Sequence, residues 1–142
     1  MQSQKGTKLG IWILLIICIS QGVYIYFSEP SRPDPTKVVS VTHVGEGGAI
    51  YEILYDSGGA TVPLIYRYFL MDIQANDQEA LKKSTEREPF LVTKSPNAVR
   101  KVIGDSVKLK TSETIYDFHN VSIYKNNGKI NIVTFDLVST VK

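Results

Sequence analysis

The residues of this sequence that could perform acid–base chemistry are two histidines, His43 and His119, and two carboxylates near the second of them, Asp117 and Asp136. A carboxylate beside an imidazole orients the ring and stabilises its protonated form, as a general base requires. Such a site also needs a nucleophile or a substrate cleft, and the sequence indicates neither. We therefore interpret His119 and Asp136 as a polar pair on the solvated face of a sheet, and we do not expect an enzyme.

The position of His119 depends on a β-hairpin predicted from the dipeptide Asn127-Gly128. Both residues tolerate positive φ, as a two-residue type I′ turn requires, and β-rich runs flank them. In the ideal register Ile123 lies opposite Ile132, and His119 lies opposite Asp136. The apolar alternation breaks directly after Ile132, so a bulge that shifts this register is left open.

No residue spacing is typical of a metal or cofactor site. The histidines are far apart, and the single cysteine, Cys18, excludes an internal disulfide and a cysteine-based zinc site. The glycine pair Gly58-Gly59 precedes a predicted strand rather than a helix, so it indicates a tight turn instead of a phosphate cradle. We expect no cofactor and no metal, and we expect His43, within a strand, to be half-buried and structural.

The charge of the chain argues against a nucleic-acid-binding protein. The formal net charge is +2, and two lysines near the N-terminus, Lys5 and Lys8, account for it. The rest of the chain is therefore close to neutral, whereas nucleic-acid binders carry a basic excess on the binding face.

A local charge asymmetry is the strongest candidate for a partner-binding site. Five basic residues in a short stretch form this candidate: Lys94, Arg100, Lys101, Lys108 and Lys110. Acidic residues gather just before them: Asp72, Asp77, Glu79, Glu86 and Glu88. The asymmetry can steer a charged protein partner, although a solvated surface is the simpler interpretation. Five tyrosines would anchor a partner if exposed and would otherwise pack the sheet: Tyr51, Tyr55, Tyr66, Tyr68 and Tyr116.

An uncharged apolar segment, Ile11 to Phe27, predicts one transmembrane helix. At about 1.5 Å per residue it spans about 25 Å, slightly less than a hydrocarbon core of about 30 Å. Lys5 and Lys8 precede it without an acid, so the positive-inside rule places residues 1–10 in the cytoplasm. We expect a single-pass protein of the bacterial inner membrane with a periplasmic or extracellular C-terminal domain.

Other fates of this segment compete with the anchor. Ser20-Gln21-Gly22 supplies the small residues that signal-peptide cleavage needs, although apolar residues continue past it to Phe27. A lipoprotein signal at Cys18 is disfavoured because the bulky Ile17 precedes it. A buried core helix is disfavoured because the segment is apolar on all sides in a small chain.

The chain is expected to hold four parts and a single α+β domain. These are a cytoplasmic tail (1–10), the transmembrane helix (11–27), a Pro-rich linker (28–36) and an extracytoplasmic β-rich domain (37–142). Period-2 alternation predicts about six or seven mostly antiparallel strands, with one or two short helices. The predicted strands are 37–44, 49–56, 61–72, 89–93, 106–109, 114–124 and 129–139. Residues 74–87 are predicted to form a short surface helix, capped by Asn76 or Asp77, or a long loop, and residues 97–103 a helix ended by Gly104.

Two segments resemble a pattern in small uncharacterised bacterial proteins with an N-terminal anchor. They are DSGGATVPLIYRYFL (Asp56 to Leu70) and PFLVT (Pro89 to Thr93), and they carry no catalytic signature. The resemblance therefore implies no site residues. In architecture alone, the predicted chain is similar to periplasmic immunity proteins, which protect a cell from toxins delivered into its periplasm.

We therefore expect a membrane-anchored, extracytoplasmic protein-binding module that neutralises a periplasmic toxin. The alternative is a structural or accessory subunit of a cell-envelope assembly, in which Ser20 and Gly22 would allow close packing of helices.

Overall fold

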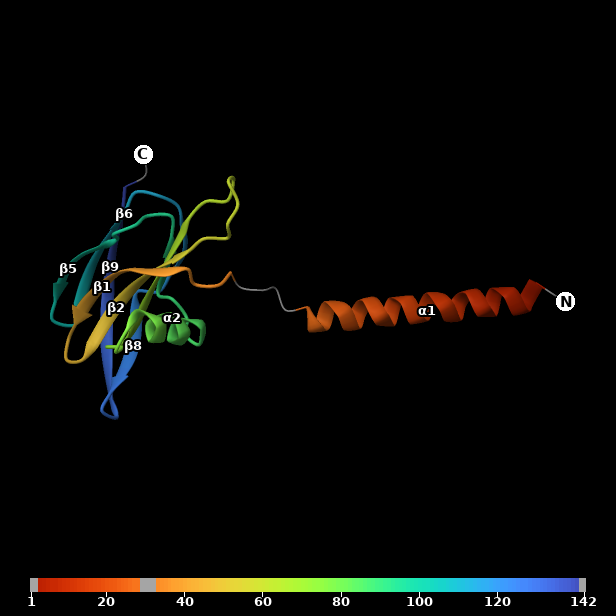
Figure 1. The fold of residues 1–142 in the computed structure, drawn as a ribbon, viewed down its shortest axis with the longest axis horizontal. Coiled ribbons are helices and arrows are strands. Elements are labelled where there is room, and N and C mark those ends of the chain that lie inside the picture. Colours follow the sequence, from red (N-terminus) through yellow and green to blue (C-terminus); the bar gives the residue numbers. More distant parts are fainter. Residues whose placement is uncertain (1–2, 29–32, 141–142) are drawn as a thin grey trace. The chain divides into compact units, whose positions relative to one another are not determined.

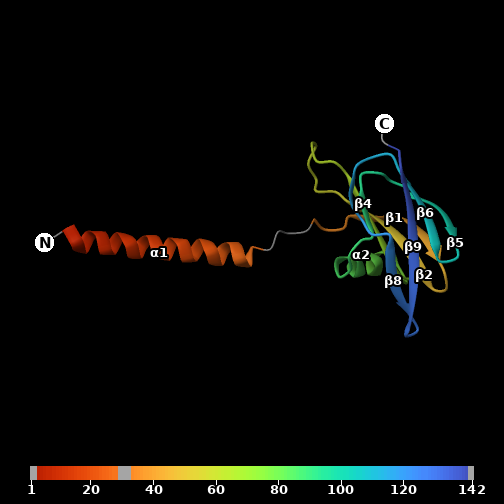
Figure 2. The same cartoon turned by 180° about the vertical axis from the view of Figure 1, so that it is seen from behind.

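The structure is a computed structural model that describes residues 3–28 and 33–140 of the 142-residue chain. It divides into two compact units with the boundary after Arg32, and Figures 1 and 2 show the helical and the β-rich unit from opposite sides. Mainly antiparallel sheets and two helices make the fold α+β, so the predicted fold class is confirmed. Of the predicted Pro-rich linker, residues 29–32 lie outside the described residues.

The first unit is the helix α1 (Ser3–Phe27). Its segment Gly6–Phe27 has 22 residues and a mean hydropathy of 2.0, so the helix is long and apolar enough to span a membrane. The Ser20 hydroxyl donates to the Ile17 carbonyl at 2.8 Å, which satisfies this polar group within the helix. The helix begins before Ile11 because no proline interrupts residues 3–10, and it includes Gly6 and Gly10.

The β-rich unit consists of two sheets. In the five-stranded sheet A the order is β1-β2-β3-β4-β7, and every pair is antiparallel. Its strands are β1 (Lys37–Val44), β2 (Gly48–Tyr55), β3 (Ile65–Asp72), β4 (Leu91–Thr93) and β7 (Ile115–Phe118). In the four-stranded sheet B the order is β5-β6-β9-β8, and only the β6–β9 pair is parallel. Its strands are β5 (Val99–Ile103), β6 (Ser106–Thr111), β8 (Val121–Asn126) and β9 (Lys129–Ser139).

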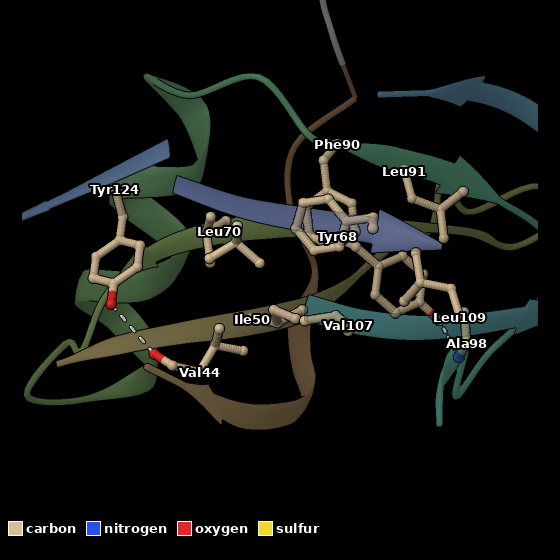
Figure 3. Packing of buried hydrophobic residues seen from close by; sticks show 12 residues of the cluster. Val44, Ile50, Tyr68, Leu70, Phe90, Leu91, Ala98, Val107, Leu109 and Tyr124 are labelled. Carbon is tan, nitrogen blue, oxygen red and sulfur yellow. Dashed lines mark hydrogen bonds between the residues drawn. The ribbon is translucent and has the colours of Figure 1, made fainter. Parts of the chain in front are cut away.

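The main core lies between the two sheets (Figure 3). Phe90 and Phe135 stack at its centre, with ring centroids 3.8 Å apart and an interplanar angle of 7°. Burial of a side chain of this size stabilises the fold by roughly 2–3 kcal/mol. The core therefore depends on alternate, inward-facing positions of strands that are far apart in the sequence.

A second apolar cluster lies on the other face of sheet A, beneath the helix α2 (Asp77–Thr85). Asn76 caps this helix by accepting a hydrogen bond from the backbone N–H of Glu79 at 2.9 Å, which confirms the predicted cap. Ala80 is fully buried against the sheet. Because apolar clusters cover both faces of sheet A, β2 is buried at every position.

Two predicted elements are wrong. Residues 99–103 of the predicted helix 97–103 form the strand β5, because their β-branched side chains favour a strand and their backbone pairs with β6. Gly104, at φ +61°, lies in the turn between β5 and β6 instead of ending a helix. The predicted strand 114–124 is interrupted after Phe118, so β7 joins sheet A and β8 joins sheet B. With nine strands, the described chain also has more and shorter strands than expected.

The predicted hairpin β8–β9 is present. Asn127 and Gly128 have φ values of 49° and 78°, as a type I′ turn requires. Ile123 lies opposite Ile132 as predicted, and the register runs to Val121 without the bulge that had been left open.

Candidate functional site

The predicted pair of His119 with Asp136 is not formed. Asp136 lies opposite Lys108 of β6, and the pairing of β8 with β9 starts at Val121, so it does not include His119. The His119 Nε2 instead lies 3.4 Å from a carboxylate oxygen of Asp117, and both side chains are more than half exposed. An ion pair this exposed to water is weak.

The other acid–base candidates do not form a site either. His43 is exposed, contrary to expectation, because it belongs to the exposed set of alternate residues along β1. Within residues 3–28 and 33–140, no group of three or more His, Cys, Asp and Glu side chains is arranged to hold a metal ion. Gly58 has a φ of +74°, and its N–H donates to the Asp56 carboxylate at 2.9 Å, which fits the predicted tight turn.

A buried carboxylate, Glu52, is the most unusual polar group of the domain. Its side chain accepts hydrogen bonds from the Ser40 hydroxyl at 2.7 Å and from the backbone N–H of Asn97 at 2.9 Å. Asn97 has a φ of 54°, a left-handed conformation that asparagine tolerates. Glu52 therefore fastens the segment between β4 and β5 to the inner face of sheet A.

Tyr68 holds the same segment from β3. Its hydroxyl donates to the Ser95 carbonyl at 2.9 Å and accepts from the Ala98 N–H at 3.0 Å. Burial raises the pKa of Tyr68 far above its ordinary value, and the charge of Glu52 adds to this effect. The hydroxyl is neutral in the fold, so the arrangement positions a loop and supplies no acid or base at neutral pH.

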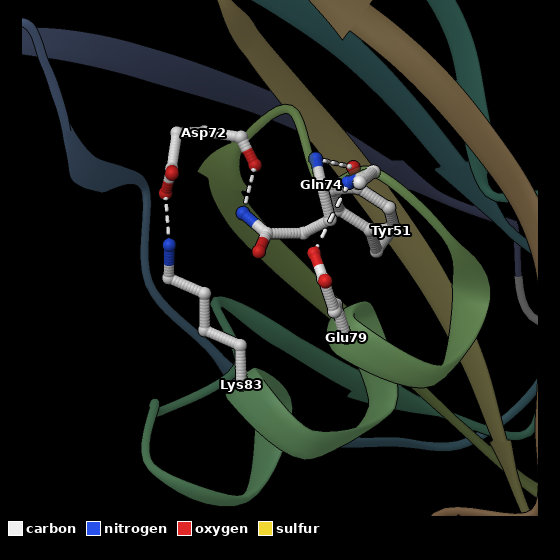
Figure 4. A network of polar contacts seen from close by, with 6 residues as sticks. Tyr51, Asp72, Gln74, Glu79 and Lys83 are labelled. Carbon is white, nitrogen blue, oxygen red and sulfur yellow. Dashed lines mark hydrogen bonds and ion pairs between the residues drawn. The ribbon is translucent and has the colours of Figure 1, made fainter.

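Of the acidic residues around α2, Asp72 attaches the helix to sheet A (Figure 4). Lys83 donates to the Asp72 carboxylate at 2.5 Å, and the Gln74 side chain donates to the Asp72 carbonyl at 2.6 Å. Partial burial raises the pKa of the Asp72 carboxyl, but the hydrogen bonds and the Lys83 charge outweigh it, so the pKa lies below its ordinary value. Glu79 is likewise engaged, because it accepts from the Ala75 N–H at 3.4 Å.

The face of sheet B that points away from sheet A, here called the outer face, is rich in exposed apolar side chains. Alternate residues of its strands are buried in the core, so the intervening residues must project outward. Its large exposed apolar residues are Ile103, Val121, Ile123, Ile130, Ile132 and Val138. Four of them, Val121, Ile123, Ile130 and Ile132, are neighbours on the β8–β9 hairpin, and Ile130 and Ile132 are 59% and 58% exposed. The outward face of an antiparallel sheet is normally polar, so this cluster indicates an interaction surface.

Three of the five predicted basic residues lie on the outer face. Lys101 and Lys108 are opposite each other on β5 and β6, and Lys110 follows on the same side of β6. Arg100 occupies the irregularity in the β5–β6 register, and Lys94 lies outside sheet B, between β4 and β5. The structure therefore gathers three lysines on the outer face, where Lys108 lies opposite Asp136, and separates Lys94 from them.

The tyrosines that could have anchored a partner mostly pack the core. Tyr51, Tyr55 and Tyr68 are buried, whereas Tyr116 on β7 is 51% exposed. The apolar cluster of the outer face was missed at the sequence level, although Val121, Ile123 and Ile132 alternate with inward-facing positions in the predicted hairpin. Because the inward-facing residues of both strands are partly apolar too, the pattern alone does not show which face is exposed.

Two cavities of about 310 and 260 Å³ lie beside β8, and Ile123 lines both; together they are here called the edge groove. The residues that line it are Arg87, Glu88, Pro89, Phe90, His119, Ile130 and Val121 to Lys125 of β8. This edge groove borders the apolar cluster of the outer face, because Val121, Ile123 and Ile130 belong to both.

In comparisons with known proteins, the chain matches no protein-family model, no curated protein and no solved structure.

Proposed function

We propose that this chain is a single-pass protein of the bacterial inner membrane whose β-rich domain lies in the periplasm and binds another protein, a toxin that it neutralises. The outer face of sheet B carries the proposal. Six large apolar side chains are exposed there, beside lysines. Exposed apolar clusters rimmed by polar residues are typical of protein-binding surfaces.

The membrane location and the orientation are supported by α1 and its flanking charges. The helix is apolar over a length that spans a hydrocarbon core. Lys5 and Lys8 lie at its N-terminal end without an acidic residue, which favours a cytoplasmic N-terminus. The β-rich domain then lies on the opposite side of the membrane.

The outer face also indicates the chemistry of the partner. Its lysines share this face with isoleucines and valines, and Lys108 lies opposite Asp136. An apolar patch on the partner would bury the isoleucines and valines, and an acidic rim would attract the lysines. Rim charges act mainly on the association rate, while the apolar centre determines most of the affinity. The partner is therefore expected to be an acidic protein.

The test begins with photo-crosslinking from the outer face in the intact membrane. A photoreactive residue replaces Ile132, and a matched control replaces the exposed Lys82 of α2, on a different surface. The partner captured from position 132 is then purified, and its affinity for the full chain is measured directly. Ile132→Lys should weaken this affinity at least tenfold, whereas Lys82→Glu should leave it unchanged.

Neutralisation is tested in cells that export the captured partner to their periplasm. Cells with the wild-type chain should grow, and cells with Ile132→Lys should be inhibited. Equal growth without any copy of the chain would show that the partner is not a toxin. Equal crosslinking from positions 132 and 82 would show that the outer face is not the binding surface.

A further inference from the structure

The free edge of β8 differs from the other three sheet edges of the described domain. The edge strands β1, β5 and β7 each carry a register irregularity, at Val39, Arg100 and Tyr116. Such bulges prevent the addition of a further strand. The pairing of β8 with β9 is regular over all six residues, from Val121 to Asn126. Among the four edge strands of the described domain, β8 is therefore the one with a regular backbone, on which another strand can be added.

The hydrogen-bonding groups on this edge can be assigned from the hairpin. In a two-residue hairpin the residues that flank the turn, Asn126 and Lys129, exchange hydrogen bonds, and the pattern repeats at every second residue. The N–H of Phe135 donates to the Asn120 carbonyl at 2.7 Å, which confirms that even-numbered residues point toward β9. The N–H and C=O groups of Val121, Ile123 and Lys125 consequently point away from β9, toward the edge groove.

The edge groove is charged differently at its two ends. Arg87 and Lys125 line one end, and Glu88 and His119 line the other. Within the part of the chain that the structure describes, neither Arg87 nor Lys125 has a carboxylate within salt-bridge distance. Two cations beside exposed backbone donors make this end a site for a carboxylate.

From these observations we propose that the edge groove binds an extended, acidic segment of a protein partner, which pairs with β8 as an added antiparallel strand. Its backbone exchanges hydrogen bonds with Val121, Ile123 and Lys125, and an acidic side chain at its N-terminal end lies between Arg87 and Lys125. Strand addition of this kind takes its affinity from the main chain and its specificity from the pockets along the strand. The partner is the protein described under the proposed function, so this proposal rests on the proposed function for the identity of the partner.

The segment would also extend the binding surface already described. A strand added beside β8 places alternate side chains on the outer face, next to Val121 and Ile123. The apolar cluster and the edge groove thus form one continuous surface, and the partner would occupy both. A second copy of this chain is the competing occupant.

The probe is a synthetic hexapeptide with aspartate first, followed by alternating threonine and valine, labelled with a fluorophore. Its binding to the full chain in detergent micelles is measured by fluorescence anisotropy. A peptide with lysine first, otherwise identical, should bind at least tenfold more weakly. N-methylation at alternate peptide bonds should abolish binding when the methylated nitrogens are those that face β8. Methylation of the other set of nitrogens should have no effect, because only one edge of the added strand faces β8.

Two variants of the chain test the groove itself. Ile123→Pro removes an N–H that points out of the sheet, which an edge strand tolerates, and Arg87→Glu reverses the charge that attracts the acidic residue. Each should lower the affinity for the probe at least tenfold with an unchanged circular dichroism spectrum. Ile132→Lys lies on the outer face but away from the edge. It should leave the affinity for the probe unchanged while it lowers the affinity for the partner.

The outcomes separate the two proposals. Probe binding that ignores N-methylation, or that survives both Ile123→Pro and Arg87→Glu, overturns the strand addition but not the function. If the chain sediments as a dimer and the Ile123→Pro variant as a monomer, the proposed partner segment is wrong, and a second copy of the chain occupies the edge of β8. Loss of partner binding in Ile132→Lys with normal probe binding supports both proposals.

Discussion

Gly48, the first residue of β2, lies directly against the ring of Tyr124 from β8, and a Cβ atom at position 48 would lie 2.5 Å from the Tyr124 Cζ. This contact joins the two sheets at one end of the core. The Tyr124 hydroxyl extends the connection, because it donates to the Glu46 carbonyl at 3.1 Å. The turn between β1 and β2 is therefore fixed to the edge strand of the other sheet.

Gly48→Ala should destabilise the domain because neither the buried ring nor the backbone can move away without a further loss of packing. We expect the free energy of unfolding to fall by about 1–3 kcal/mol, as is typical of an overpacked core. The measurement is chemical denaturation of the full chain in detergent, followed by the β signal in circular dichroism. In a Tyr124→Ala background the same substitution should have little effect, and an unchanged cost there would contradict the contact.

Tyr68→Phe should destabilise the domain without creating a cavity. The substitution removes the hydroxyl that bonds to the Ser95 carbonyl and the Ala98 N–H, and it leaves both buried groups unsatisfied. The expected loss is about 1–3 kcal/mol. Tyr116→Phe is the matched control, because Tyr116 is exposed and should show a change close to zero. Equal effects of both substitutions would show that the hydroxyl of Tyr68 does not hold the loop.

The same tyrosine makes stability depend on alkaline pH. Burial raises the pKa of Tyr68 in the folded state above its unfolded value of about 10, so the folded state retains a proton that the unfolded state loses. The stabilisation is complete below about pH 10 and decreases as pH rises above it, by up to about 1.4 kcal/mol per pH unit. Denaturation between pH 8 and 11 should show this slope, and Tyr68→Phe should reduce it. Tyr124, whose pKa is also raised, accounts for part of the remaining slope.

His119→Ala tests for catalysis, because an enzyme built around this imidazole would lose its activity while it still binds its partner. The imidazole makes one exposed contact, with Asp117, and lies at the acidic end of the edge groove. Because His119 also lines the edge groove, partner affinity is measured beside growth: protection should fall no further than the affinity does, and stability should be unchanged. A complete loss of protection with normal partner binding would instead indicate catalysis by His119.

Local signals in the sequence were sufficient for much of the fold. β1 has the predicted bounds, α2 begins after the predicted cap at Asn76, and the turn at Asn127-Gly128 has the predicted geometry. These elements depend on side chains that act on their own backbone or on a strict alternation. The signal failed at β5, where a proline and a glycine that suggested helix ends flank a strand held by its pairing with β6.

The candidate site was less accessible from the sequence because it depends on contacts between distant segments. The β6–β9 pair is parallel and joins residues of two separate hairpins, which places Lys108 beside Asp136 rather than beside a groove. The interruption after Phe118 transfers the chain between sheets and removes His119 from the predicted pairing. Neither the parallel pairing nor the interruption is indicated by a local sequence pattern. The basic stretch was therefore predicted, but not that Lys94 lies apart from the lysines of sheet B.

The role of α1 can be tested by replacing residues 3–27 with an unrelated membrane-spanning helix of the same orientation. A domain that acts through the outer face needs only to be held at the membrane, so neutralisation should be retained. A subunit of an envelope assembly that packs through Ser20 and Gly22 would lose its function with the helix, since small residues allow the close approach of neighbouring helices. Ser20→Leu with Gly22→Leu in the native helix gives the same comparison with fewer changes.

The replacement is informative only if α1 is retained in the mature chain. The chain should therefore stay in the membrane fraction after alkaline extraction, with a reporter at its C-terminus active in the periplasm. A mature N-terminus at Val23, directly after Ser20-Gln21-Gly22, would instead release a soluble domain and remove the anchor from the function. Because the outer face belongs entirely to sheet B, a released domain would keep its binding surface and lose only its concentration at the membrane.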